Sequence, residues 1–190
     1  MSTTRSAGDA GSEQRPVLIC YDGSRHGDAV IDAAADLFPG AHVEVLCIGS
    51  YGSDFITVPE GPISPFMPNV DPDRLDASIE ASREEAQAMA DAGARAARST
   101  GLHATTRVEM TRGSSWGRIV AVAEATPYAA VMIGSRGHSA IRTALLGGTS
   151  TGVAAHCTRP VVVVHGPDVP PLEIDIDERD IAEDLHLAGQ

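Results

Sequence analysis

The sequence predicts an α/β domain built on a doubly wound, five-stranded parallel sheet. Short apolar runs of strand length alternate along the chain with longer segments whose apolar residues recur at helical spacing. A glycine-rich loop, residues 134–150, lies between one such run and a helical segment, as expected for a strand–loop–helix unit. The 190 residues, 43% of them hydrophobic, are enough for one domain with a core and terminal segments.

The first strand is expected at Val17–Cys20, an apolar run followed by a polar turn that ends at Ser24. Ser24 is a suitable N-cap for a helix, because apolar residues recur at helical spacing between positions 29 and 37. Pro39 and Gly40 end this helix. His42–Ile48 is then the expected second strand.

The middle of the chain predicts a long connection, a long helix and a third strand. Gly49–Pro72 contains five Pro, and a connection of this length is usually a lid, an interface or a disordered segment. Asp73–Thr100 is rich in Ala, Glu and Arg and is expected to be helical up to Gly101. Leu102–Met110 alternates enough to be a strand.

The segment Gly113–Gly117 matches G-x-S-x-G, the pattern of the nucleophile elbow of α/β-hydrolases, between a strand and the expected helix Arg118–Ala125. A serine hydrolase would also need an acid and then a His downstream, and Glu124 falls inside the helix. We therefore expect Ser114 or Ser115 to act as a helix cap, and hydrolase chemistry remains the weakest alternative.

The last part of the domain contains two more strands around the glycine-rich loop. Ala129–Ile133 and Val161–Val164 have the length and composition of buried strands. A helical segment after the loop ends near Cys157, and Pro160 separates it from the last strand.

The loop itself has the residue types of an anion-binding site. Glycines allow close approach to backbone amides, and Gly147-Gly148 leads into a helix whose first amides lack intrahelical partners. Hydroxyls and cations follow nearby: Thr149, Ser150, Thr151, Arg136, His138 and Arg142. The alternative is a glycine-rich turn with an ordinary Ser/Thr cap.

The arrangement Gly134-x-x-Gly137, nine residues, Gly147 resembles the nucleotide loop of the universal stress protein family. The likeness extends to VLICYDGS at residues 17–24 and RPVVVV at residues 159–164, and covers about Pro16–His165. The family pattern has Ser or Thr at the position of Gly148, whereas here the hydroxyls follow at Thr149 and Ser150.

The resemblance implies an adenine-nucleotide alpha-hydrolase-like fold with strand order 3-2-1-4-5. Strands one and four would then lie side by side, so that Asp22 faces the glycine-rich loop across one crevice. From the residues alone, Asp22 could equally cap the following turn or helix.

The resemblance also implies an ATP site and a regulatory or signalling role in the stress response. Adenine and ribose would be surrounded by Tyr21, Asp22, Gly23 and Ile48, with Ile133 lining the pocket. Ribose and phosphates would be held by Gly134, Gly137, Gly147, Gly148, Thr149 and Ser150, with Arg136 as a nearby cation. Mg²⁺ would enter on the phosphates.

Three further expectations concern activity and partners. No general base or set of metal ligands is visible near the loop, so we do not expect efficient ATP hydrolysis. The resemblance implies a homodimer formed through the apolar edge strand Val161–Val164. The main alternative is a dimeric interaction protein that works without nucleotide, on a protein partner that the sequence does not identify. Gly148, in place of the family's Ser or Thr, favours this alternative.

The charge distribution argues against a nucleic-acid partner. The net charge is −12, and the segment 167–190 contributes −7 from eight acidic residues and Arg179. We expect a disordered segment 1–15, a domain 16–166 and an acidic tail 167–190. The first segment lacks the apolar core of a secretory signal and no run approaches membrane-spanning length, so we expect a cytoplasmic protein away from membranes.

Two further composition features exclude other sites. The chain has no Lys, so it cannot contain a Walker-type P-loop. Its three Cys are odd in number and widely spaced, which argues against a disulfide framework or a zinc site. Apart from His138, we expect the His residues at the surface or at strand edges.

Overall fold

The computed structural model describes residues 15–50, 72–135 and 148–166, with the side chains of 72–75 excepted. Its sheet confirms the predicted architecture: five strands, all parallel, in the order β3-β2-β1-β4-β5. The strands are β1 (Val17–Cys20), β2 (His42–Ser50), β3 (His103–Thr111), β4 (Ala130–Gly134) and β5 (Val161–Val164). β1 and β4 are therefore neighbours, and the order of the strands reverses between them.

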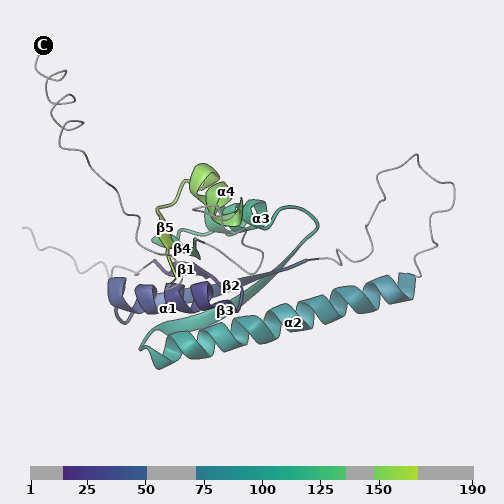
Figure 1. The fold of residues 1–190 in the computed structure, drawn as a ribbon, viewed down its shortest axis with the longest axis horizontal. Helices are drawn as coiled ribbons and strands as arrows, with labels where there is room; N and C mark the ends of the chain where they lie inside the picture. Colours follow the sequence, from purple (N-terminus) through teal and green to yellow (C-terminus); the bar gives the residue numbers. More distant parts are fainter. Residues whose placement is uncertain (1–14, 51–71, 136–147, 167–190) are drawn as a thin grey trace, which may run out of the picture.

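Helices cover both faces of the sheet (Figure 1). They are α1 (Arg25–Leu37), α2 (Pro72–Ser99), α3 (Ser115–Ala125) and α4 (Gly148–His156). Side-chain alternation along the strands divides the core: Val17 and Ile19 pack with α1 and α2, whereas Leu18 packs with α3 and α4. The doubly wound arrangement follows from strands that are apolar on both faces.

Two element boundaries differ from expectation by more than one residue, and those of α2, β3 and β4 are shifted by one. α3 begins at Ser115, three residues before the expected Arg118, because Ser114 has the extended backbone of an N-cap (φ −73°, ψ 134°). β2 continues past Ile48 because Gly49 and Ser50 pair with Met110 and Thr111 at the end of β3.

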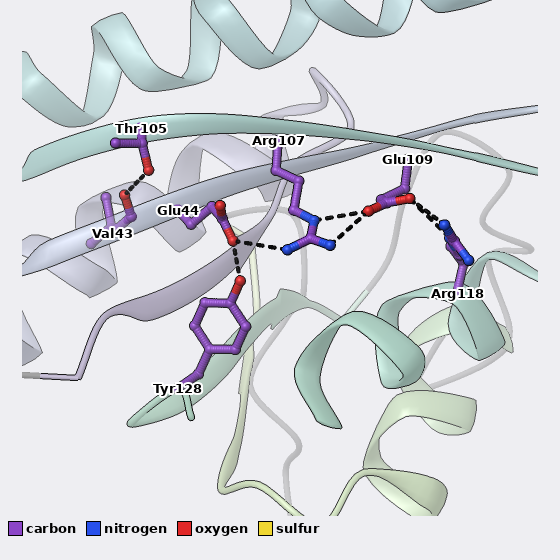
Figure 2. A network of polar contacts seen from close by, with 7 residues as sticks. All are labelled: Val43, Glu44, Thr105, Arg107, Glu109, Arg118 and Tyr128. Atoms are coloured by element: carbon purple, nitrogen blue, oxygen red, sulfur yellow. Dashed lines mark hydrogen bonds and ion pairs between the residues drawn. The ribbon is translucent and has the colours of Figure 1, made fainter. Parts of the chain in front are cut away.

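A chain of polar contacts lies on the α3 side of β2 and β3 (Figure 2). Glu44 accepts a hydrogen bond from the Tyr128 hydroxyl and lies 3.7 Å from the guanidinium of Arg107. Arg107 bonds Glu109 at 2.8 Å, and Glu109 also accepts from Arg118 on α3. Burial alone would raise the pKa of Glu109, but Arg118 and Arg107 hold it below its usual value.

Several expectations fall outside the described residues. These are the segment 1–14, most of the connection 49–72, the central part of the glycine-rich loop with Arg136, Gly137 and Gly147, and the tail 167–190. In the part of the chain that the structure describes, no helix is both long and apolar enough to span a bilayer.

Candidate functional site

The turn after β1 is fixed by its own side chains. Asp22 Oδ1 accepts hydrogen bonds from the backbone N–H and the hydroxyl of Ser24, at 3.1 and 2.6 Å. The Ser24 hydroxyl in turn accepts from the Gly27 N–H at 3.2 Å, which caps α1 as expected. Gly23 adopts φ +73°, a conformation that favours glycine. Asp22 is thus held at the carboxyl edge of the sheet.

The position of this turn depends on Tyr21, whose ring lies between α1 and α2. A Cβ added at Gly27 or Gly93 would meet the ring at 2.9 or 2.7 Å, so both helices need glycine at these contacts. The Tyr21 hydroxyl donates to Asp28 at 2.9 Å, and burial with this bond raises the pKa of Tyr21 to about 12.

The backbone of Tyr21 is also engaged. Its N–H donates to the Leu46 carbonyl at 2.9 Å, and its carbonyl accepts from the Cys47 thiol at 3.1 Å. Burial raises the pKa of that thiol to about 12, so Cys47 stays protonated and can donate. Tyr21 therefore anchors the turn, and its side chain belongs to the α1–α2 layer.

The end of β4 is joined to α4 by a buried hydrogen bond. Ser135 follows Gly134 and is fully buried; its N–H donates to the Val164 carbonyl at 2.7 Å. Its carbonyl accepts a 3.1 Å hydrogen bond from the hydroxyl of Ser150, which is only 2% exposed. The first turn of α4, where a helix's backbone amides have no partner within the helix itself, is therefore held beside the end of β4.

A buried hydroxyl at this point has no partner. Among the described residues, Ser135 Oγ and His26 Nε2 are the buried side-chain polar atoms without a hydrogen bond. Ser135 was not among the expected site residues, although its place directly after a strand in the glycine-rich loop is a signal that could have found it. His26 is more enclosed than the expected surface position, because its ring packs against Gly166.

The remaining expected site residues divide between the surface and the core. Gly148 is exposed, and a Cβ there would meet no atom within 4 Å. Ile48 and Ile133 pack into the α3–α4 core, and Ile133 keeps 6% exposure. Thr149 and Gly134 are partly exposed. The structure thus brings the Asp22 turn, the end of β4 and the α4 N-terminus to neighbouring positions at one edge of the sheet.

The hydrolase alternative gains no support from the segment 113–117. Ser114 precedes α3 with an ordinary extended backbone, and no described residue other than glycine has a positive φ. Glu124 accepts from the N–H and hydroxyl of Thr158, at 2.8 Å each. Neither Ser114 nor Ser115 hydrogen-bonds a His within the described segments, and no group of three potential metal ligands occurs there.

The model of the Universal stress protein family matches residues 14–165, most of the chain. The chain belongs to this family. The match starts just before β1 and ends directly after β5, so it covers all nine helices and strands that the structure describes. The comparison with curated proteins finds no match.

Solved structures of the family have the same fold. The universal stress protein UspA from Lactobacillus plantarum is 18% identical with a TM-score of 0.62, covering 79% of this chain and 97% of that one. A family protein from Arabidopsis thaliana with AMP bound is 12% identical with a TM-score of 0.54, covering 84% and 97%. The universal stress protein from Archaeoglobus fulgidus in complex with dAMP is 19% identical with a TM-score of 0.51, covering 79% and 97%.

Proposed function

We propose that this universal stress protein binds an adenine nucleotide, ATP in particular, at the carboxyl ends of β1 and β4. The observation that carries the proposal is the Ser150–Ser135 hydrogen bond, which holds the α4 N-terminus beside the strand neighbouring the Asp22 turn. Backbone amides at a helix N-terminus attract anions such as phosphates. Family members in complex with AMP and dAMP support the adenine part.

The residues present fit such a ligand. Asp22, Gly23 and Ile48, with the backbone of Tyr21, would surround adenine and ribose, and Ile133 would form the pocket floor. The phosphates would lie against Gly134, Gly148 and Thr149 and the α4 amides, together with Arg136, Gly137 and Gly147. The unpartnered Ser135 hydroxyl supports this fit, because an unsatisfied buried group costs about 1–3 kcal/mol and a ligand oxygen would supply its partner.

The proposal is one of binding, with Mg²⁺ entering on the phosphates, and it includes no catalytic step. Nucleotide occupancy would report the state of a cytoplasmic regulatory module to a partner protein. A homodimer would form along β5, an edge strand of the described sheet whose four Val are all partly exposed.

Calorimetric titration of the purified chain with ATP, ADP and AMP tests the site. Gly137→Val and Gly147→Val should abolish binding, because a branched side chain would fill the space of the phosphates. Gly113→Val is the matched control, since an added Cβ there would have only Thr111 Oγ1 within 4 Å, at 3.9 Å.

Two outcomes would contradict the proposal: no binding of any of these nucleotides at millimolar concentration, or normal binding by both loop variants. The first outcome would favour the alternative function, a dimeric interaction protein that works without nucleotide. That alternative is motivated by Gly148, which stands where the family pattern has Ser or Thr.

A further inference from the structure

A cavity lies at the edge of the sheet opposite the proposed nucleotide site, where the strands begin. Its volume is about 510 Å³, and it is lined by Arg15, Pro16, His42, Val43, His103, Thr105 and Pro127. His42 and His103 are the first residues of β2 and β3 and pair with each other, and Arg15 lies two residues before β1. This cavity is therefore separate from the proposed nucleotide site.

Three groups that can carry positive charge meet in this cavity. The imidazole rings of His42 and His103 stack with their centroids 5.0 Å apart and an interplanar angle of 29°. Within the described part of the chain, no hydrogen bond or ion pair engages these two rings or the guanidinium of Arg15.

The carboxylate two residues after His42 on β2 is already engaged by other side chains. Glu44 lies two residues beyond His42 on β2, and its carboxylate is bound by the Tyr128 hydroxyl and approached by Arg107 at 3.7 Å (Figure 2). Thr105 beside it donates to the Val43 carbonyl at 3.3 Å, which leaves its hydroxyl oxygen able to accept. Within residues 15–50, 72–135 and 148–166, no ion pair joins an acidic side chain to this cluster.

We propose that this cavity binds a small organic anion, a carboxylate or phosphate carried on an apolar body. The anionic group would pair with the forked guanidinium of Arg15 and with the imidazoles of His42 and His103. Pro16, Val43 and Pro127 form apolar walls suited to the rest of the ligand.

The test is an NMR titration of the full chain, labelled in its His rings, with phenyl phosphate, benzoate and inorganic phosphate. We expect both aromatic anions to shift the His42 and His103 signals, and to leave His156 on α4 unchanged. Arg15→Gln and His103→Gln should each weaken phenyl phosphate binding about tenfold, as expected for one lost charge-assisted hydrogen bond. His156→Gln is the matched control and should bind as the wild type does.

Three results would overturn the proposal. They are the absence of any shift at His42 and His103, unchanged affinity in the Arg15→Gln/His103→Gln double variant, and inorganic phosphate binding as tightly as phenyl phosphate. Gly137→Val should leave this binding unchanged. A failure here is thus distinguishable from a failure of the nucleotide site.

Discussion

The hydroxyl of Ser150 donates a buried 3.1 Å hydrogen bond to the backbone carbonyl of Ser135. The bond joins the first turn of α4 to the residue that follows β4, across a part of the glycine-rich loop. It fixes the α4 N-terminus through a buried hydroxyl. The sequence places Ser150 among the phosphate-binding residues, and in the structure its hydroxyl proton is used to position the helix.

Ser150→Ala should weaken nucleotide binding severalfold and lower the free energy of unfolding by about 1 kcal/mol, because the buried Ser135 carbonyl loses a donor. Titration calorimetry and urea denaturation measure the two effects. Thr151→Ala, an exposed change on the same helical turn, is the control and should alter neither. Unchanged affinity in a folded Ser150→Ala protein would show that the α4 position is set elsewhere.

Gly148→Ser should strengthen ATP binding by about 0.5–1.5 kcal/mol, the net value of one hydrogen bond. The structure has room for this side chain, since an added Cβ meets nothing within 4 Å and Gly148 is not among the glycines with positive φ. Gly148→Ala is the matched variant without a hydroxyl and should bind as the wild type does. Weaker binding by the Ser variant, compared at one salt concentration, would refute the prediction.

Gly93→Ala should destabilise the fold, because its Cβ would come within 2.7 Å of the Tyr21 ring and 3.0 Å of Val45. Overpacking of this kind costs about 1–3 kcal/mol, which outweighs the gain of about 1 kcal/mol from Ala in a helix. Urea denaturation gives the difference, with Gly148→Ala as an unhindered Gly→Ala control. A Gly93→Ala protein as stable as wild type would mean that Tyr21 can move freely.

The stability of the protein should fall at alkaline pH through Tyr128. Burial and the hydrogen bond to Glu44 raise the pKa of Tyr128 to about 12 from its ordinary 10.0. A pKa raised on folding contributes stability that is complete below pH 10 and is lost as the pH rises towards 12.

Denaturation at a series of pH values should therefore show a decline that is smaller in Tyr128→Phe. The pKa of Tyr21 is also raised to about 12, so part of the stability loss should remain in the Tyr128→Phe protein. Tyr21→Phe is therefore the parallel measurement. A Tyr128→Phe protein that loses as much stability as wild type across this range would contradict the assignment.

The fold could be predicted largely from local patterns. Strand-length apolar runs such as Val17–Cys20 and Val161–Val164 form strands with the expected bounds, because both faces of the sheet are covered by helices. The order of the strands required the family resemblance, since periodicity does not say which strands are neighbours. Ser24 was recognisable as a cap because capping is a local interaction between adjacent residues.

The candidate site was less predictable because its contacts are long-range. Asp22, Gly148 and the end of β4 were expected at one edge, but the unpartnered Ser135 and the inward Ser150 depend on how α4 packs. The position of Tyr21 depends on Gly93, which lies 72 residues later in the chain. Nothing in the sequence next to Gly93 indicates why glycine is needed there.

The alternating charges Glu44, Arg107, Glu109 and Arg118 have a consequence for how β3 is aligned. β3 pairs with β2 alone in the described sheet, and a shift by one residue would turn every side chain to the opposite face. Arg107 and Glu109 would then point into the apolar α2 layer, without their present partners. The ion pairs thus hold β3 in its register, and the same partly exposed charges discourage an added strand from displacing β3 at this edge.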